Sequence, residues 1–209
     1  MRDRNAPLGP EDIETLAWEK MHGLLPAVVQ DADTGEVLML GYMDRAALAA
    51  TLTRGLATFL SRSRGGLWTK GETSGNHLSV TAVHVDCDAD ALLVKARPAG
   101  PTCHTGTTSC FSGDLDGAGW LAKLQRTIAQ RAAAGSQASY TARLLAGGVA
   151  KVAQKVGEEG VETALAAVTR DDAGLADEAA DLLYHLAVLL QARGLGWEDV
   201  VAVLKARAA

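Results

Sequence analysis

The chain has 209 residues, of which 48% are hydrophobic and 22% are charged, and its formal net charge is −5 at pH 7. This length and composition are ordinary for a globular protein and allow one large domain or two smaller ones, each with its own core. The negative charge argues against a nucleic-acid-binding protein with a basic surface. No apolar stretch approaches the roughly 20 residues that a membrane-spanning helix needs, so we expect no membrane partner.

The N-terminal segment and the cysteine count favour a cytoplasmic protein. The first twenty residues are polar and acidic and lack the apolar core of a signal peptide. The chain has three cysteines, all in its first half. An odd number of cysteines in a reducing compartment argues against a disulfide framework and favours metal binding or catalysis.

Strand and turn signals dominate the first half of the chain. Short apolar, β-branched runs predict strands over residues 24–31, 37–43, 57–63, 77–85 and 91–97. Between the second and third of these, Asp44 is a suitable N-cap for a short helix that Gly55 would end. We therefore expect an α+β domain with a mostly antiparallel sheet.

The second half of the chain has a helical period. Apolar residues recur at spacings of three and four in sets that begin at Trp120, Leu145, Val161, Leu182 and Trp197. Breaks fall at AAAGSQAS, TRDDAG and ARGLG. We predict a first domain at residues 1–113, a Gly- and Asp-rich linker at 114–119, and an all-α domain of four or five helices at 120–209.

The three cysteines favour a zinc site. Cys87, Cys103 and Cys110 follow the spacing C-x15-C-x6-C. Three thiolates suit a zinc ion that keeps one position for water, as catalytic zinc does. Free cysteines are also common as small buried residues, but Cys103 and Cys110 lie in the polar segment GPTCHTGTTSCF. His104 follows Cys103 directly, so an acid–base role near the metal suits it better than ligation of the same ion.

The sequence DCDAD allows a second metal site. If this run is extended, Asp86, Asp88 and Asp90 share one face and Cys87 lies on the other. Three carboxylates on one face favour a hard cation such as Mg²⁺ or Ca²⁺, whereas Cys87 would face a soft metal. A solvated acidic turn is the alternative explanation.

A basic stretch between the predicted strands suits a phosphate. Cations alternate with hydroxyl and glycine residues there, and the candidate ligand residues are Arg62, Ser63, Arg64 and Lys70. A basic hairpin tip is the alternative. Trp68 would either stack on a base or anchor its strand.

Acidic pairs recur on two consecutive predicted helices. The acids are Glu158, Glu159 and Glu162 in KVGEEGVETAL, and Glu178 and Asp181 in DEAADLLYH. Residues three apart share a helix face, so two such helices packed antiparallel would aim four carboxylates at one place. Like charges so placed imply divalent cations, and Mg²⁺ held by carboxylates is typical of phosphate chemistry. A single E-x-x-E motif is common on a solvated helix face, but the pairing of two such motifs on consecutive helices is more specific. Nearby cations would hold phosphates or stay solvated: Arg143, Lys151 and Lys155.

These motifs resemble two known enzyme families. The first domain resembles phosphoribosyl-AMP cyclohydrolases in GLLPAVVQDADTGEVLMLGYMD, SRSRGGLWTKGETSGN, VDCDADALL and GPTCHTGTTSCF. The second resembles phosphoribosyl-ATP pyrophosphatases, all-α enzymes of the MazG type, in SYTARLLAGGVAKVAQKVGEEGVETALAA and DEAADLLYHLAVLL. The order is that of the fused bifunctional enzymes of histidine biosynthesis. Met21 and His22 depart from the regular pattern at the N-terminal edge.

The resemblance implies two consecutive hydrolytic reactions. The helical domain would hydrolyse phosphoribosyl-ATP to phosphoribosyl-AMP and pyrophosphate, with Mg²⁺ on its five acids. The first domain would open the adenine ring between N1 and C6, with zinc on the three cysteines activating water, His104 as the proton donor and Mg²⁺ on the aspartates. The resemblance also implies a homodimer in which the zinc ligands come from both chains.

Two other functions explain parts of the sequence. A nucleobase deaminase also uses zinc, but the signature H-x-E…P-C-x-x-C is absent from the chain. A zinc-stabilised α+β module joined to a helical dimerisation domain would need neither the five helical acids nor a zinc position open to water.

Overall fold

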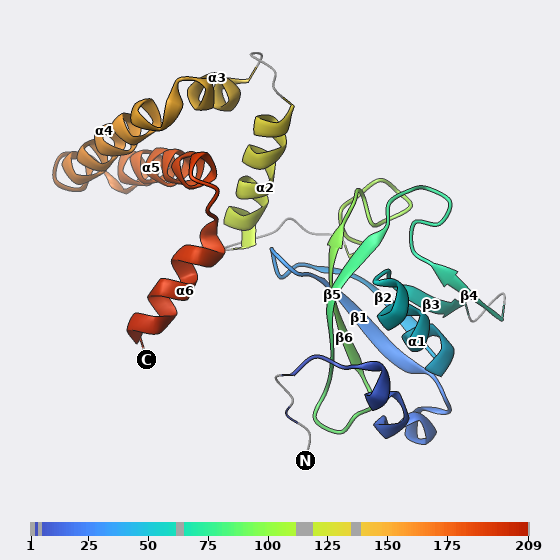
Figure 1. Ribbon diagram of the computed structural model, residues 1–209. Helices are drawn as coiled ribbons and strands as arrows, with labels where there is room; N and C mark the ends of the chain where they lie inside the picture. Colours follow the sequence, from blue (N-terminus) through green and yellow to red (C-terminus); the bar gives the residue numbers. More distant parts are fainter. Residues whose placement is uncertain (1–2, 4–5, 62–64, 112–118, 135–138, 209) are drawn as a thin grey trace. The chain divides into compact units, whose positions relative to one another are not determined.

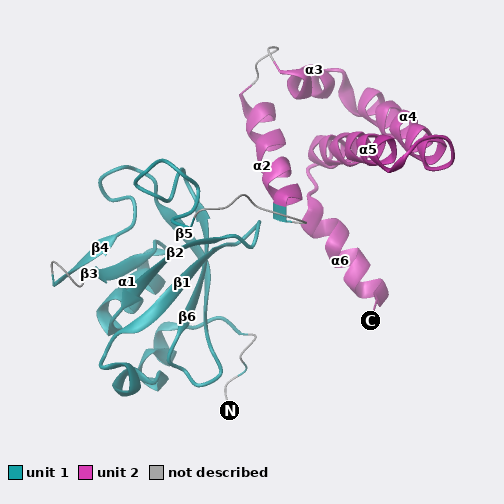
Figure 2. Ribbon diagram, turned by 180° about the vertical axis from the view of Figure 1, so that it is seen from behind, with its two compact units in different colours: residues 1–119 teal, residues 120–209 magenta. Residues whose placement is uncertain are grey.

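The computed structural model describes residues 3, 6–61, 65–111, 119–134 and 139–208. The chain forms two compact units, Met1–Gly119 and Trp120–Ala209, which are described separately below (Figure 2). The first contains the sheets and the second is helical, as the sequence predicts. No helix among the described residues is long and apolar enough to span a membrane.

A four-stranded sheet forms the centre of the N-terminal unit. Its strand order is β2 (Val37–Met43), β1 (Leu25–Asp31), β6 (Leu92–Pro98) and β5 (Leu78–Val85) (Figure 1). Only the β1–β6 pair is parallel, so the prediction of a mostly antiparallel sheet is confirmed.

A helix and a hairpin complete this unit. Helix α1 (Arg45–Arg54) begins where Asp44 accepts a hydrogen bond from the Ala47 amide and ends at Gly55, as predicted. Strands β3 (Thr58–Ser61) and β4 (Gly66–Thr69) then pair antiparallel. Two short 3₁₀ helices, η1 (Pro10–Thr15) and η2 (Trp18–Met21), precede the sheet. Buried side chains from all these parts form one core: Trp18, Leu25, Leu38, Leu48, Phe59 and Leu92.

Five helices form the described part of the second unit. They are α2 (Gly119–Ala133), α3 (Tyr140–Ala146), α4 (Gly148–Thr169), α5 (Asp172–Ala192) and α6 (Trp197–Ala208). Helices α4 and α5 are the longest and lie side by side (Figure 1). The core between α2, α3, α4 and α5 is small: Ile128, Leu144, Val152, Ala187 and Val188.

One expected helical run is broken. The periodicity from Leu145 to Val149 predicts one helix, but α3 ends at Ala146 and α4 begins at Gly148. Gly148 has a φ of +82°, a left-handed conformation that favours glycine and that a continuous helix does not contain. The break allows α3 to pack back against α4 and α5.

Candidate active sites

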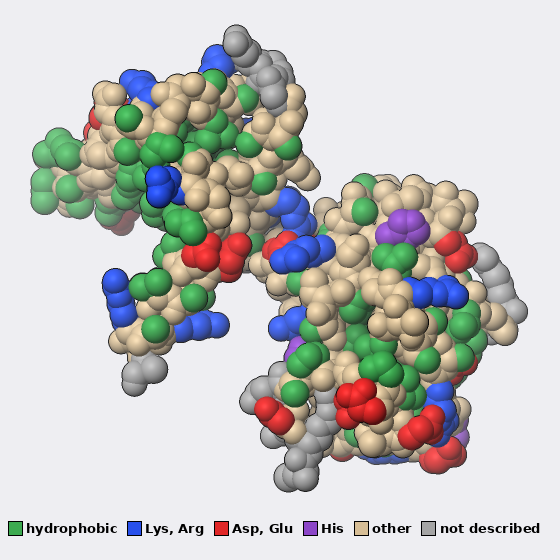
Figure 3. All heavy atoms as spheres, in the orientation of Figure 1, with side chains coloured by type: hydrophobic (Ala, Val, Ile, Leu, Met, Phe, Trp, Pro, Cys, Tyr) green, Lys and Arg blue, Asp and Glu red, His purple; other side chains and the backbone are tan. Residues whose placement is uncertain are grey.

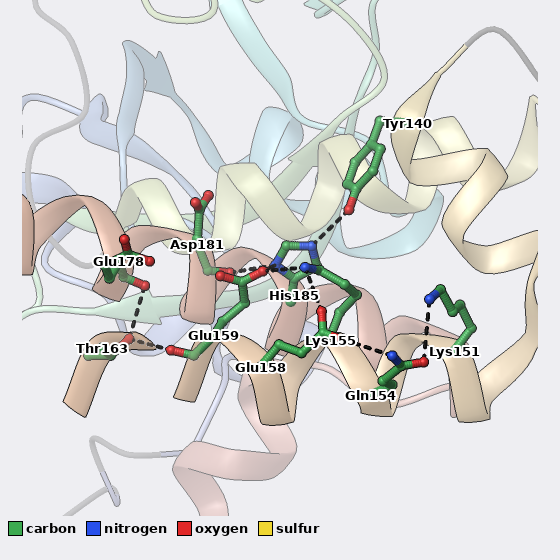
Figure 4. Close-up of polar contacts among 10 residues, drawn as sticks. All are labelled: Tyr140, Lys151, Gln154, Lys155, Glu158, Glu159, Thr163, Glu178, Asp181 and His185. Atoms are coloured by element: carbon green, nitrogen blue, oxygen red, sulfur yellow. Dashed lines mark hydrogen bonds and ion pairs between the residues drawn. The ribbon is translucent and has the colours of Figure 1, made fainter. Parts of the chain in front are cut away.

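Three acids of the helical unit converge between α4 and α5. Glu159 of α4 and Glu178 and Asp181 of α5 each place one carboxylate oxygen within 4.8 Å of the others (Figure 4). Thr163 links the two helices here, because its hydroxyl lies 2.7 Å from the Glu159 carbonyl oxygen and 3.1 Å from that of Glu178. We name these three carboxylates the acid cluster.

Glu159 is the most enclosed member of the acid cluster, and only 4% of its surface is exposed. Its Oε1 lies 2.8 Å from the Lys155 ammonium, which holds the pKa of the Glu159 carboxyl below its usual value. Glu162 lies beside it and is exposed, and the negative charge of Glu159, followed by partial desolvation and the charge of Glu178, raises the pKa of Glu162. Carboxylates that repel one another in this way are stabilised by a divalent cation, so the donor set fits Mg²⁺.

Glu158 has different contacts from the acid cluster. Its side chain accepts hydrogen bonds from Gln154, at 2.7 Å, and Lys155, at 2.8 Å. Both contacts, with Lys155 first, lower the pKa of the Glu158 carboxyl. In this chain Glu158 is therefore directed along the surface of α4, towards its N-terminal half (Figure 4).

The basic candidates of this unit lie on α3 and α4. Lys155 pairs with Glu158 and Glu159, and Lys151 donates to Gln154 at 3.3 Å. Arg143 lies on α3 and is exposed. Lys155 thus provides a positive charge beside Glu159, while Lys151 and Arg143 lie further towards the N-terminus of the chain. Arg170, which follows α4, supplies a second charge, because it pairs with Glu178 at 2.5 Å.

In the N-terminal unit the DCDAD run is a turn and not an extended strand. Strand β5 ends at Val85, β6 begins at Leu92, and Ala89 adopts a φ of +63°. Asp86 Oδ1 accepts hydrogen bonds from the amides of Asp90, at 3.0 Å, and Ala91, at 3.2 Å. The predicted separation of Cys87 from the aspartates on opposite faces is therefore wrong: ligand atoms of Asp86, Cys87 and Asp88 lie within 4.8 Å of one another. The chain must reverse here, and a turn does not keep the alternation of a strand.

Lys20 supplies a positive charge to this turn. Its ammonium forms ion pairs with Asp88 and Asp90. Hydrogen bonds to Asp88 and Asp90 raise the pKa of Lys20, and Lys20 in turn lowers the pKa of Asp88. A cation is thus already part of the arrangement of these carboxylates, and oxygen donors of this kind fit Mg²⁺.

Cys103 and Cys110 lie in a loop that is pinned to the sheet. The Cys110 amide donates to the Leu38 carbonyl of β2 at 2.7 Å, and the Ser109 hydroxyl donates to the Val37 carbonyl, also at 2.7 Å. The Thr105 hydroxyl donates to Cys103 Sγ at 3.1 Å. This bond, helped by the Thr105 amide, lowers the pKa of Cys103 to about 6, so the thiolate, which is the form that binds zinc, prevails at neutral pH.

The three cysteines do not form one site within the described residues of a single chain. Cys87 groups with Asp86 and Asp88, and no such group of ligand atoms contains Cys103 or Cys110. Cys103 and Cys110 lie near each other. Partial burial and the negative charge of the nearby Cys103 thiolate both raise the pKa of the Cys110 thiol. His104 is exposed beside them, with Nδ1 3.8 Å from Cys103 Sγ.

A pocket of about 370 Å³ lies next to β4. Its lining includes two of the predicted substrate-binding residues and is formed by Ser61, Trp68, Thr69, Lys70, Gly71, Glu72, Thr73 and Ser74. Trp68 also packs on Phe59 with ring centroids 5.3 Å apart, so it both anchors its strand and faces the pocket. Gly71 has a φ of +87°, and a Cβ there would come within 2.4 Å of the Asn76 backbone. Arg62, Ser63 and Arg64 lie outside the described residues.

Family models and relatives match both units. A model of phosphoribosyl-AMP cyclohydrolase matches residues 39–112, and one of phosphoribosyl-ATP pyrophosphohydrolase matches residues 121–208. The histidine biosynthesis bifunctional protein HisIE of Xanthomonas campestris is 57% identical over 195 residues, which are 93% of this chain and 94% of that protein. The HisIE protein of Vibrio vulnificus is 53% identical over 197 residues, 93% of either chain.

The chain belongs to this bifunctional histidine-biosynthesis family. It is accordingly a bifunctional hydrolase, and its two units are called the cyclohydrolase domain and the pyrophosphohydrolase domain below. The HisIE protein of Xylella fastidiosa, 57% identical over 192 residues, is also matched along 92% of its length. The likeness thus extends over both domains and not over one of them.

The structure adds one residue of the pyrophosphohydrolase domain that the sequence analysis does not single out. His185 of α5 is 5% exposed, and its Nδ1 lies 3.6 Å from the Glu159 carboxylate. The sequence carries a signal for it, because His185 follows Asp181 by four residues and so shares its helix face. A single histidine in an apolar helix is more often a core residue than part of a polar site. Only the packing of α5 against α4 shows that His185 lies beside a carboxylate.

Replacing Lys20 tests its place in the aspartate turn of the cyclohydrolase domain. We expect Lys20→Met to bind Mn²⁺, a substitute for Mg²⁺, a few-fold more tightly, because the ion no longer has to displace the ammonium from Asp88 and Asp90. The gain is small because the ion pairs are solvent-exposed. The measurement is calorimetric titration in a Glu159→Gln background, in which the acid cluster is impaired. Lys123→Met, which removes an exposed lysine of α2, is the control. Weaker binding by Lys20→Met would mean that Lys20 shapes the turn for the ion instead of competing with it.

Proposed function

We infer that this chain catalyses two consecutive hydrolytic steps of histidine biosynthesis. The pyrophosphohydrolase domain converts phosphoribosyl-ATP to phosphoribosyl-AMP and pyrophosphate, and the cyclohydrolase domain then opens the adenine ring between N1 and C6. The observation that carries this conclusion is the match of one chain to both families over nearly its whole length. The zinc-stabilised structural module is disfavoured, because it leaves the acid cluster without a role.

In the pyrophosphohydrolase domain we propose that Glu159, Glu178 and Asp181 hold Mg²⁺. When bound, Mg²⁺ would neutralise the triphosphate and assist the attack of water. Glu162 is our candidate to accept a proton from that water, because it is exposed on α4 one turn from Glu159, whose charge raises the pKa of the Glu162 carboxyl. Lys155 would then turn from the acids to the phosphates, with Lys151 and Arg143 as further phosphate contacts and Glu158 as an outer carboxylate.

In the cyclohydrolase domain we propose that Cys87, Cys103 and Cys110 hold zinc, which when bound supplies Lewis-acid activation of water. The Thr105 hydroxyl keeps Cys103 in the ligating form. His104 is the candidate that gives N1 its proton as the N1–C6 bond breaks, since it lies beside Cys103 and is accessible. The turn from Asp86 to Asp90 would hold Mg²⁺.

The substrate of the cyclohydrolase domain would enter the pocket beside β4. Lys70 supplies a cation and Trp68 an aromatic face there, which suit a phosphate and an adenine ring respectively. Arg62, Ser63 and Arg64 lie outside the described residues and are kept as phosphate candidates on the sequence alone.

We further propose that the protein is a homodimer. The separation of Cys87 from Cys103 and Cys110 supports this, because a zinc site made of all three thiolates is readily completed by a second chain. Apolar side chains exposed on α4 support it as well: Val161 is 61%, Leu165 55% and Val168 78% exposed. Figure 3 shows hydrophobic side chains gathered over the outer end of the α4–α5 pair. Apolar surface of this kind is typical of a protein interface. We place the reactions in the cytoplasm, where thiols stay reduced.

The test supplies phosphoribosyl-ATP to the full chain with Mg²⁺ and Zn²⁺. Pyrophosphate release and the absorbance change of ring opening are followed separately. We expect pyrophosphate first and ring opening after a lag, whereas phosphoribosyl-AMP should give ring opening without lag or pyrophosphate. Absence of both signals from a folded, metal-loaded protein would favour the structural module.

A further inference from the structure

His185 lies on α5 next to the acid cluster and is close to groups of both α4 and α5. Its Nδ1 is 2.9 Å from the carbonyl oxygen of Asp181 and 3.6 Å from Oε1 of Glu159 (Figure 4). His185 and Glu159 are 5% and 4% exposed, so both groups are shielded from water. The imidazole thus faces one carboxylate of the acid cluster and the backbone of another residue of the same cluster.

The hydrogen bonds fix which ring nitrogen carries a proton. A carbonyl oxygen only accepts, so Nδ1 of His185 must be the donor to Asp181. Oε1 of Glu159 lies 3.6 Å from the same nitrogen, so the polar edge of the ring faces this carboxylate in a contact longer than a hydrogen bond. On the other side of the ring, Nε2 lies 3.1 Å from the Tyr140 hydroxyl. In the neutral ring Nε2 accepts from that hydroxyl, so both nitrogens have partners.

Aromatic packing holds the ring in this orientation. The rings of Tyr140 and Tyr184 meet the imidazole edge to face, with centroids 6.1 Å and 5.1 Å away. The Tyr184 hydroxyl in turn lies 2.8 Å from that of Thr141 on α3. The orientation of His185 therefore depends on α3 as well as on α5.

We propose that His185 is a positioning residue of the pyrophosphohydrolase site, which directs Glu159 towards Glu178 and Asp181 and so prepares the acid cluster for a divalent cation. The inference rests on the proposed function of this domain. The groups that surround and orient a metal ligand typically change metal affinity or activity by about 10- to 100-fold when they are removed. Lys155 also contacts Glu159, but it is a flexible cation, whereas the imidazole is held on three sides.

Three substitutions in the full chain separate positioning from simple packing. His185→Asn keeps an N–H near the position of Nδ1, His185→Gln places its amide near Nε2, and His185→Phe keeps only the ring shape. We expect the Phe variant to bind Mn²⁺ about tenfold or more weakly and to need correspondingly more Mg²⁺ for pyrophosphate release. The Asn variant should recover most of the Mn²⁺ affinity and most of the native Mg²⁺ dependence, and the Gln variant should recover neither.

The measurements are Mn²⁺ binding by electron paramagnetic resonance and the Mg²⁺ dependence of pyrophosphate release. In Glu159→Gln the acid cluster is impaired, so the Mn²⁺ that this variant still binds measures binding elsewhere in the chain. Ring opening of phosphoribosyl-AMP shows whether the cyclohydrolase domain is intact in each variant. If the Phe variant matches the native chain, or if Asn is no better than Phe, His185 only packs and the proposal is overturned. Failure of the proposed function is distinct, because the native chain itself would then release no pyrophosphate.

Discussion

The Glu159→Gln variant is expected to release pyrophosphate from phosphoribosyl-ATP about 10²- to 10³-fold more slowly than the native chain, the range typical for loss of one transition-state charge stabiliser. Glu159 is the most enclosed carboxylate of the acid cluster, and glutamine keeps its shape but not its charge. The loss removes a metal donor and leaves Lys155 with one carboxylate partner instead of two. Pyrophosphate release over a range of Mg²⁺ concentrations measures the effect, and excess Mg²⁺ should restore only part of it.

Two controls accompany this result. Ring opening by Glu159→Gln should equal that of the native chain when phosphoribosyl-AMP is supplied directly, because the cyclohydrolase domain is untouched. Asp177→Asn removes one exposed carboxylate of the same helix as Glu178 and should keep pyrophosphate release. Native-like release by Glu159→Gln, or equal losses in both variants, would show that the acid cluster does not carry the reaction.

The second large effect is expected for Cys103→Ser. We expect ring opening of phosphoribosyl-AMP to fall below detection, while pyrophosphate release from phosphoribosyl-ATP stays within about twofold of the native rate. The native thiolate is stabilised by the Thr105 hydroxyl, and serine offers a hydroxyl that does not ionise at neutral pH and binds zinc poorly. Zinc content by mass spectrometry should fall together with ring opening.

The control for Cys103→Ser is a change in the same loop that spares the sulfurs. Thr108→Ala removes an exposed side chain between Cys103 and Cys110 and should keep zinc and ring opening. If Cys103→Ser keeps its zinc but loses ring opening, Cys103 acts in the reaction without holding the metal. Loss of pyrophosphate release in a folded Cys103→Ser protein would contradict the division of labour between the domains.

The sequence by itself predicts the elements of both domains well, because their signals are local. Short apolar, β-branched runs mark β1, β2, β5 and β6, and Asp44 and Gly55 mark the ends of α1 through capping that involves only neighbouring residues. The i, i+3 spacing of the acids likewise places Glu178 and Asp181 on one face of α5 before any packing is known. The family motifs then indicate the two reactions.

Other features depend on contacts between distant parts of the chain. Which carboxylates converge is decided where α4 packs on α5, so Glu159 joins Glu178 and Asp181 while Glu158 contacts Gln154. The DCDAD run has the alternation of a strand but is bent by the reversal between β5 and β6.

The sequence determined the fold class, most helix and strand positions and the residue types of both sites, because propensity, capping and periodicity act over a few residues. It did not predict strand β4 or the break between α3 and α4. Only the tertiary structure decided that His185 supports Glu159, that Lys20 meets Asp88 across the sequence, and that Cys87 lies apart from the other two cysteines. These are contacts between segments, and their geometry follows from how whole elements pack rather than from the order of residues within one element.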